Sequence, residues 1–423
     1  MARAFLDTLR DPTTLLLASA DGEAGARRTR GGSRIRGQFA MAGASILAAT
    51  PPDPELLAHL RTLGLGAERV FAPAVVSWRK PLTQLVLEDA ALLARLRRAP
   101  DLSCAMAAFK DASAAQVLER IGLPAAWCAP SPDAYAHAND KLAFAQAAAR
   151  FGFDAVPLEP VADAAAVAET FDALSQTFGE GCIVRLRRGS SGHGVHRARS
   201  RRAAVRRWRR LRPLGEVLLA PYVPPGRVVR NVATHGIVTG GRFAPLVFSD
   251  QIVRGTDFRG GRVEAAWTTD ERAAIAHTLD GVARWLATLG YAEAPAGVDG
   301  FLVREAGTLR FLALDPNIRL TATMMPWAIM ATLAEAADRA FVWQFETHVI
   351  VGAALSFARL VRRLGDDLLR PEAWARGGIV PTLLAPAHLG VGRSVLSAIL
   401  IATDAGHLAH LAARVQSLGL RHL

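Results

Sequence analysis

The sequence predicts an α/β fold in which a small parallel α/β domain precedes a larger region of two α+β lobes. Short apolar segments alternate with amphipathic helical segments early in the chain, which is typical of a parallel sheet. Further along, residues 297–304 and 309–315 are two strand-like segments around a tight turn, the pattern of a β-hairpin. A chain of 423 residues is long enough for two or three domains.

The composition excludes several classes of protein. Hydrophobic residues make up 51% of the chain, but no apolar run approaches the roughly 18 to 20 residues that span a bilayer. The first residues lack the charged-then-apolar order of a secretory signal. The 3 cysteines include no Cys-x-x-Cys pair, which argues against a disulfide scaffold and a zinc site. We therefore expect a soluble cytoplasmic protein with no membrane partner, and a homodimer is compatible with the sequence.

The first domain is expected over residues 1–135. It begins with a helix-prone segment and a basic, Gly-rich loop at 27–36, followed by a buried strand at 45–49. The sequence Thr50-Pro-Pro-Asp-Pro54 indicates the start of a helix that continues to about residue 63. Strands are expected at 70–72 and 84–87, helices at 89–98 and 114–121, and a loop at 130–133 ends the domain.

The larger region is expected over residues 136–339. The predicted helices are 141–150 and 271–289, and the predicted strands before the hairpin are 181–185, 216–223 and 228–238. Residues 340–423 are predicted to be helical at first and then to form a smaller α/β extension. This extension would contain strands at 378–384 and 395–402 and a helix at 407–418.

Two carboxylates and one carboxamide are expected to meet on the hairpin. Folding brings Asp299 and Asp315 within a residue of being cross-strand partners, with Cβ atoms roughly 5 Å apart on one face. Asn317 follows Asp315 by two residues, so its side chain is expected on the same face. Such an all-oxygen set suits Mg²⁺, which takes one or two protein carboxylates and completes its shell with water and phosphate oxygens. A solvated hairpin with incidental acids is the alternative.

A Gly/Ser loop follows another predicted strand. Residues 181–185 have the pattern of a buried strand, and Gly189-Ser-Ser-Gly-His-Gly-Val195 come soon after it. Glycines let backbone N–H groups wrap an anion without Cβ clashes. Such loops also serve as simple hairpin connectors, so this loop alone leaves phosphate binding open.

The order of these segments resembles the ATP-grasp superfamily of ligases from residue 139 to about residue 323. That family has, in order, a "DK…G…P" segment, a strand with a Gly/Ser loop, a linker strand, a "G…D" acid and an "E-x-N-x-R" motif. The corresponding parts of this chain are Asn139-Asp-Lys141 with Phe151-Gly-Phe, Ile183-Val-Arg185 with the loop, residues 216–223, Asp299, and Asp315-Pro-Asn-Ile-Arg319. The resemblance implies that residues 136–339 are an ATP-grasp core with ATP and Mg²⁺ as cofactors, and that residues 1–135 are a pre-ATP-grasp domain. Within the core it implies a lid lobe at about 153–223 and a metal-bearing lobe at about 224–339.

The resemblance also implies roles for individual residues. Lys141, one of only 3 lysines, would contact the ATP phosphates, as would Arg185, which stands where the family usually has a lysine. Asp299, Asp315 and Asn317 would hold Mg²⁺, although Asp315 replaces the usual glutamate. The other nucleotide contacts would come from the loop and the linker strand, through Gly189, Ser190, Ser191, Gly192, His193, Gly194, Ala220, Tyr222 and Val223.

Two arginines are candidates for catalysis. Arg319 follows the metal candidates, where a guanidinium would stabilise the oxyanion formed when an amine attacks an acyl phosphate, or bind the substrate carboxylate. Arg254, in the segment 251–261, is the second candidate.

The flanking segments resemble the pheganomycin-type peptide ligases. The segments concerned are residues 46–57, 319–326 and 377–381. The resemblances together imply an ATP-dependent carboxylate–amine ligase that forms an amide through an acyl phosphate. Its substrates would be amino acids or short peptides of secondary metabolism.

Two alternatives to a ligase remain, one from the distribution of charge and one from the residues that differ from the family motifs. The net charge is +12, and residues 185–212 hold twelve arginines and no acid, a cluster that could contact nucleic acid. A solvated helix face near the nucleotide phosphates explains the cluster equally well, so we do not expect a nucleic-acid partner. Arg185, Asp315 and the lack of an acid in the linker strand are compatible with a degenerate, nucleotide-binding regulatory protein.

Overall fold

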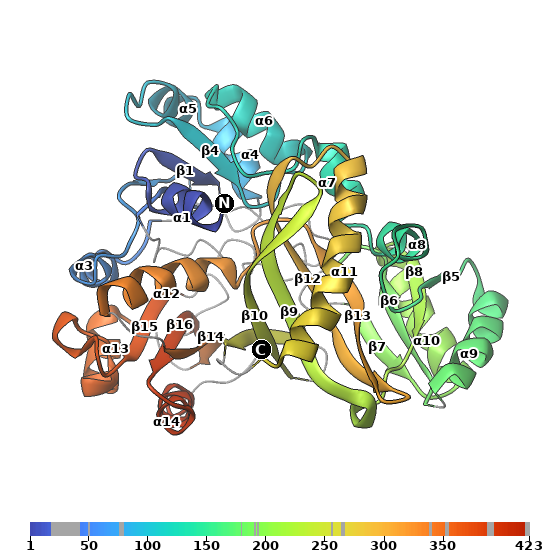
Figure 1. Cartoon of the computed structure of the whole chain (residues 1–423). Helices are drawn as coiled ribbons and strands as arrows, with labels where there is room; N and C mark the ends of the chain where they lie inside the picture. Colours follow the sequence, from blue (N-terminus) through green and yellow to red (C-terminus); the bar gives the residue numbers. More distant parts are fainter. Residues whose placement is uncertain are drawn as a thin grey trace.

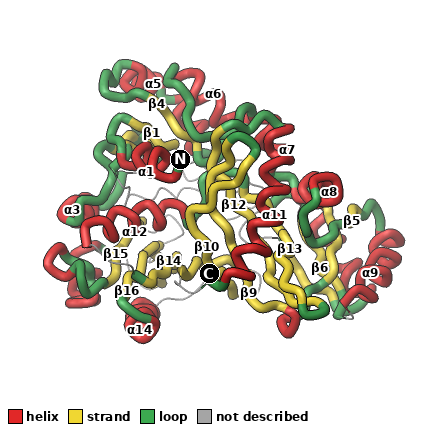
Figure 2. The backbone as a smooth tube through the Cα atoms, viewed as in Figure 1, coloured by secondary structure: helices red, strands yellow, loops and turns green. Residues whose placement is uncertain are grey.

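The fold is described from a computed structural model. The structure describes residues 1–17, 43–49, 51–75, 80–178, 180–189, 192, 194–254, 257–263, 267–337, 341–351, 355–386 and 393–418. Within these residues the chain forms three sheets with helices packed on them, which confirms the α/β class (Figures 1 and 2). No helix of the described part is long and apolar enough to cross a membrane.

The first sheet is parallel, as predicted, with the order β3-β2-β1-β4. Its strands are β1 (Thr14–Leu17), β2 (Ser45–Leu47), β3 (Val70–Phe71) and β4 (Cys104–Ala107). The helices around it are α1 (Ala2–Arg10), α3 (Pro54–Thr62), α4 (Leu82–Glu88), α5 (Ala90–Arg97) and α6 (Ala112–Ile121). The β1 side chains are buried on both faces, which is why the strand continues from Thr14 as an unbroken run of three leucines. The predicted loop at 27–36 lies outside the described residues.

The strand predicted at 84–87 was wrong, because these residues belong to helix α4. Leu82, Leu85 and Val86 are its buried apolar residues, at the i, i+3 and i+4 spacing of one helix face. A four-residue apolar run fits a strand and a buried helix equally well by periodicity. Packing of this face in the core beside the parallel sheet selects the helix.

The second sheet belongs to a lid of mixed α and β structure. Helices α7 (Pro132–Ala138) and α8 (Lys141–Phe151) lead into it. The sheet is antiparallel with the order β5-β8-β6-β7, and its strands are β5 (Glu159–Pro160), β6 (Cys182–Leu186), β7 (Val195–Ala198) and β8 (Val217–Pro221). Helices α9 (Ala164–Phe178) and α10 (Arg201–Leu211) share an apolar core with it.

The third sheet has eight antiparallel strands in the order β13-β12-β9-β10-β11-β14-β16-β15. The first five along the chain are β9 (Val228–Thr239), β10 (Arg242–Arg254), β11 (Asp257–Val263), β12 (Glu293–Glu305) and β13 (Thr308–Asn317). Helix α11 (Thr269–Thr288) packs across β9, β12 and β13 (Figure 1). This arrangement confirms the predicted hairpin and long helix.

The C-terminal residues extend this same sheet. Strand β14 (Val342–Val351) pairs with β11, β16 (Arg393–Ala402) pairs with β14, and β15 (Gly378–Pro386) pairs with β16. The helices of this part are α12 (Met324–Ala337), α13 (Phe357–Leu364) and α14 (Ala405–Gln416). The helix expected from residue 340 was wrong, because that segment is β14. Trp343 and Phe345 enter the apolar core of this part of the molecule, and aromatic residues favour a strand.

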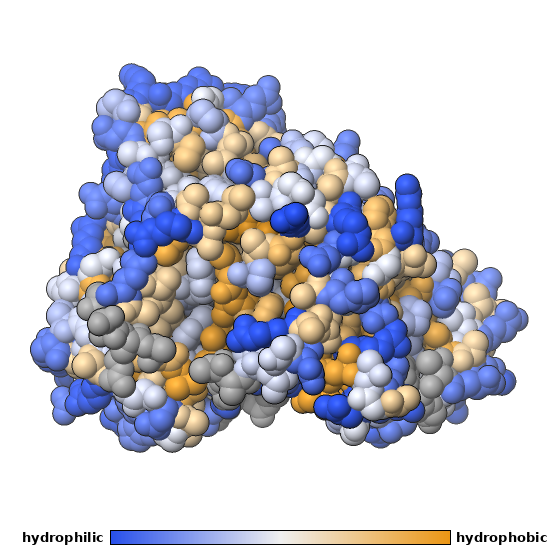
Figure 3. Space-filling model, in the orientation of Figure 1, coloured by the Kyte–Doolittle hydropathy of each residue, from blue (hydrophilic) through white to orange (hydrophobic). Residues whose placement is uncertain are grey.

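The three sheets meet around the middle of the molecule. Residues of α8, β8, β12 and β13 share an apolar cluster that joins the lid to the large sheet. A second cluster joins α1 and β4 to the start of α12. Figure 3 shows hydrophilic residues over most of the periphery and hydrophobic residues toward the middle of this view.

Candidate functional site

The site begins at the β12–β13 hairpin. Asp299 and Asp315 are direct register partners, and the register shifts between Asp299 and Gly300. Asn317 Nδ2 donates a hydrogen bond to Asp299 Oδ2 at 2.8 Å, so both side chains lie on the same face. The predicted gathering of two carboxylates and a carboxamide is confirmed. Their role as metal ligands stays a prediction.

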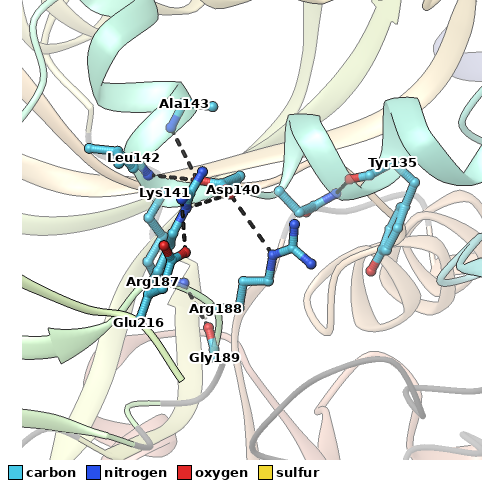
Figure 4. Close-up of polar contacts among 10 residues, drawn as sticks. Tyr135, Asp140, Lys141, Leu142, Ala143, Arg187, Arg188, Gly189 and Glu216 are labelled. Atoms are coloured by element: carbon cyan, nitrogen blue, oxygen red, sulfur yellow. Dashed lines mark hydrogen bonds and ion pairs between the residues drawn. The ribbon is translucent and has the colours of Figure 1, made fainter. Parts of the chain in front are cut away.

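A lysine at the start of α8 reaches the same carboxylates. Asp140 caps α8 by accepting hydrogen bonds from the backbone N–H groups of Leu142 and Ala143, which fixes Lys141 as the first helical residue. Lys141 is 5% exposed, and its Nζ donates to the Gly189 carbonyl at 2.7 Å (Figure 4). The same Nζ lies 3.8 Å from Asp315 Oδ1. Lys141 therefore connects the start of the Gly/Ser loop to the hairpin carboxylates.

Arg185 makes the closest contact between the lid and the hairpin. It lies on β6, is 2% exposed, and its Nη2 donates to Asp315 Oδ1 at 2.5 Å and to Oδ2 at 2.7 Å. Its Nε is also buried and has no hydrogen-bond partner within the described part of the chain. An unpaired buried guanidinium N–H costs free energy, and it is suited to an anionic oxygen.

The Gly/Ser loop is described only in part. Gly192 and Gly194 have φ angles of 78° and 73°, a conformation that favours glycine. A Cβ at Gly194 would lie 2.7 Å from Leu186 Cδ1, so the return of the loop into β7 requires glycine there. Ser190, Ser191 and His193 lie outside the described residues.

Two contacts that sequence reasoning missed fix the base of this loop. Arg187 Nε donates to both carboxylate oxygens of Asp140, at 2.9 and 2.8 Å, and its Nη1 donates to Glu216 Oε2 at 2.8 Å (Figure 4). These charged partners raise the pKa of Arg187. Asp140 could be recognised beforehand as a helix cap beside Lys141, but its pairing with Arg187 depends on the tertiary fold.

The linker strand supplies apolar surface. Ala220 and Val223 are buried in the cluster that joins the lid to the large sheet. Tyr222 follows β8, and the Arg197 guanidinium lies 3.5 Å from its ring centroid. The structure thus places these three predicted nucleotide contacts at the end of β8, an interior strand of the lid sheet.

The loop after β13 carries Arg319. Its Nη1 donates to Asn317 Oδ1 at 2.5 Å, and its guanidinium lies 4.9 Å from the ring centroid of Phe109, which follows β4. Asn139 fixes this loop, because its Nδ2 donates to the Ile318 carbonyl at 3.2 Å and its Oδ1 accepts from Ile318 N at 2.9 Å. Arg319 therefore lies between the hairpin and the first domain.

Arg254 is less well defined. It is the last residue of β10 and pairs with Asp257 of β11 in the sheet register. Its side chain lies outside the described residues, so its catalytic role stays a prediction.

The two hairpin carboxylates differ in their surroundings. Burial raises the pKa of Asp299 to about 7, and the neighbouring Asp315 contributes to this shift, while the Asn317 hydrogen bond opposes it. Asp315 has Arg185 against both of its oxygens. Asp315 is therefore paired directly with a cation, whereas Asp299 is not.

The donor types of this cluster fit a hard cation. It offers carboxylate and carboxamide oxygens, the ligands that Mg²⁺ prefers. Within the described residues there is no group of three or more His, Cys, Asp and Glu side chains that could hold a metal ion. A cation here would therefore be bound by two carboxylates, one amide oxygen, water and phosphate oxygens. Arg185, which now contacts Asp315, would then turn toward the anion that accompanies the cation.

The fold resembles those of several solved enzymes. The biotin carboxylase domain of Hydrogenobacter thermophilus 2-oxoglutarate carboxylase matches with a TM-score of 0.57 and 13% identity over 97% of this chain and 90% of that one. The N5-carboxyaminoimidazole ribonucleotide synthetase of Thermus thermophilus matches with a TM-score of 0.53 and 16% identity, over 96% of this chain and 98% of that one. The L-amino acid ligase of Bacillus licheniformis matches with a TM-score of 0.54 and 11% identity, over 97% of this chain and 98% of that one.

The chain has an ATP-grasp-like fold. At these identities the matches establish the fold alone. No family model matches the sequence, and no curated protein matches it. The ATP-grasp-like core places the lid sheet opposite the hairpin, so that Lys141 and Arg185 lie against the hairpin carboxylates.

Proposed function

We propose that this protein is an ATP-dependent carboxylate–amine ligase that forms an amide bond through an acyl phosphate. The observation that carries the proposal is the convergence of Lys141 and Arg185 on Asp315, beside Asp299. Two cations from the lid side and two carboxylates from the hairpin are the groups needed to hold a nucleotide triphosphate with Mg²⁺. The orphaned Nε of Arg185 supports an anion at this position.

The chain's own residues have distinct tasks in this reaction. Lys141 and Arg185 would bind phosphate oxygens, and Asp299, Asp315 and Asn317 would hold the metal ion, which supplies charge neutralisation when bound. The substrate carboxylate oxygen takes the γ-phosphoryl group as its bond to ADP breaks. The amine nitrogen then attacks the acyl carbon, inorganic phosphate leaves with the bonding electrons, and the amine proton passes to solvent. Arg319 would stabilise the oxyanion formed in this second step.

The solved structures support this chemistry by analogy. The 2-oxoglutarate carboxylase domain was crystallised as a dimer with MgADP and bicarbonate, and another match is a ligase of L-amino acids. Amino acids or short peptides are therefore the substrates that we propose. The more specific resemblance to pheganomycin-type ligases stays a prediction from the sequence motifs.

A hydroxylamine trap tests the proposal. The protein is incubated with Mg-ATP, hydroxylamine and panels of amino acids and short peptides, and hydroxamate and ADP are measured together. Equal amounts of hydroxamate and ADP with one acid are expected. Release of AMP instead would indicate adenylation and contradict the acyl phosphate, and ATP binding without turnover across the panel would favour the degenerate regulatory protein.

A further inference from the structure

A narrow cleft lies beside Arg319, between the first domain and the start of β12. It is lined by residues at the end of β4, by the segment 127–129, by Tyr135 of α7, by the start of β12 and by residues 318 and 319. Its free volume of about 10 Å³ has room for about one water-sized group. A small polar end of a ligand therefore fits the cleft better than a bulky side chain.

The charge of the cleft has one sign. Its lining includes two cationic residues, Lys110 and Arg319, and no acid. Lys110 is half-buried, its Nζ lies 3.5 Å from the Pro130 carbonyl, and its charge opposes the rise that burial causes in the pKa of the neighbouring Cys128 thiol. Neither neighbour is an ionised carboxylate, so the charge of Lys110 has no anionic partner within the described residues. Lys110 is also one of only three lysines in the chain.

The wall of the cleft is held in a strained conformation. Trp127 has a φ angle of 48°, a backbone conformation that is rare and strained for a bulky residue. Its indole N–H donates to Thr8 Oγ1 at 2.9 Å, and its ring packs edge-on against Phe5 at 5.3 Å. Helix α1 thus maintains the turn that places Cys128 beside Lys110. Strain of this kind is concentrated at sites that bind ligands.

The position of the cleft relates it to the proposed reaction. Lys110 follows β4, at the carboxyl end of the parallel sheet, where open α/β sheets bind ligands. Arg319 faces the cleft and also hydrogen-bonds Asn317 of the metal-candidate cluster. Arg319 therefore connects the cleft that contains Lys110 to the cluster proposed to hold the metal ion.

We propose that this cleft is a carboxylate subsite in which Lys110 binds the free carboxylate of the amine substrate. This inference rests on the proposed ligase function, and it narrows the amine to an amino acid rather than an amine that lacks an acid group. The donor carboxylate is consumed in the acyl phosphate, whereas the acceptor keeps its own carboxylate throughout. Lys110 lines the cleft and is not one of the residues proposed to bind the phosphates, so its charge is available for that second carboxylate.

The test compares amino acids with their α-carboxamides, which have the same shape but no negative charge. The hydroxylamine trap, which needs no amine substrate, first identifies the donor acid. With that donor fixed, product formation is measured for the twenty common amino acids and their α-carboxamides. The proteins compared are the wild type, Lys110→Gln, Lys110→Arg and the control Lys80→Gln, whose lysine pairs with Glu88 on the surface.

The wild type should prefer the free acid. In Lys110→Gln the KM for that acid should rise about tenfold to a hundredfold, as expected for loss of a charged hydrogen bond. Its KM for the amide should change little, and its hydroxamate rate should fall less than the KM rises. Lys110→Arg should restore part of the preference, and Lys80→Gln should match the wild type.

An acid-to-amide preference that is unchanged in Lys110→Gln would overturn the subsite, as would a wild type without any preference. Absence of hydroxamate in the wild type would instead refute the ligase proposal. In that case calorimetric titration of the same acids and amides into the wild type and Lys110→Gln still decides the subsite. Selective binding of acids that depends on Lys110 would support it, and equal binding by the two proteins would refute it.

Discussion

At the scale of single residues, the site depends on two carboxylates that are neutralised differently. Asp315 has Arg185 at 2.5 and 2.7 Å and Lys141 at 3.8 Å, whereas Asp299 accepts a hydrogen bond from the neutral Asn317 and has a pKa of about 7. A cation placed between them would favour the ionised form of Asp299. The same difference predicts that two matched substitutions change the free energy of unfolding differently.

Asp299→Asn and Asp315→Asn should both lower ADP formation by at least about 100-fold, because each removes a proposed metal ligand. Their stabilities should differ. Asp315→Asn removes the charge that faces the buried Arg185 and should lower the free energy of unfolding by about 3 kcal/mol. Asp299→Asn removes a like charge and should leave the free energy of unfolding at pH 8 unchanged or raise it.

Urea unfolding of both variants at pH 8, beside ADP release, provides the comparison. If the two variants lose the same stability, the proposed difference in neutralisation is wrong. If Asp299→Asn keeps full activity, Asp299 is not a metal ligand.

A buried histidine should make stability depend on pH. His235 is 3% exposed, its Nδ1 lies 2.8 Å from Thr321 Oγ1, and burial lowers its pKa from 6.5 to about 3. Below pH 6.5 the unfolded chain binds a proton that the folded protein does not, so stability is lost as the pH falls. The loss from one such group is about 1.4 kcal/mol per pH unit, and it vanishes above pH 6.5.

Urea unfolding at pH 6.0 and 5.0 measures this slope. His235→Gln should lose less stability than the wild type over that interval, by up to about 1.4 kcal/mol. His277→Gln, which changes an exposed histidine of α11, should keep the wild-type slope. Identical slopes in all three proteins would show that His235 is not held neutral.

At the scale of elements, the sequence was sufficient where the contacts are local. The β12–β13 hairpin and its Asp299–Asp315 register follow from alternation and one tight turn, which includes Ala306 and Gly307 at φ 48° and 85°. The contact between Arg185 and Asp315 spans 130 residues, so no local pattern contains it. Strand β14 was also missed, because its place in the sheet is set by partners on both sides rather than by its own alternation.

The ion pair between β6 and β13 should restrain the lid in the absence of ligand. Arg185→Gln removes the ion pair that joins the two elements, and Asp315 loses the nearer of its two cations. We expect faster hydrogen exchange in β6 and β7 of the free variant and about tenfold weaker ADP binding, equivalent to about 1.4 kcal/mol. Arg201→Gln is the control, because its ion pair with Asp172 joins α10 to α9 within the lid.

Exchange measured by mass spectrometry on free and ADP-bound protein separates the two expectations. Exchange in β6 and β7 that is equal in the wild type and Arg185→Gln would mean that apolar contacts alone hold the lid.

At the scale of the whole molecule, the arginine-rich segment divides into separate environments. Arg185 pairs with Asp315, Arg187 with Asp140 and Glu216, Arg197 with Glu180, and Arg201 with Asp172. The remaining arginines of α10 that are exposed on a common helix face are Arg202, Arg206, Arg209 and Arg210. The continuous cluster of the sequence is thus a partly neutralised lid surface.

Replacing these four arginines together with glutamine tests the nucleic-acid alternative. Because the face is solvated and lies on the lid away from Lys141 and Asp315, ADP formation should stay within about twofold of the wild type, as for other surface substitutions. Any binding to duplex DNA should be weak and non-specific, and the slope of log K against log salt should become shallower by up to about 3.6. Salt-resistant, sequence-selective binding that the variant loses would instead make nucleic acid a partner. Complete loss of ADP formation with the fold intact would place this helix face at the substrate.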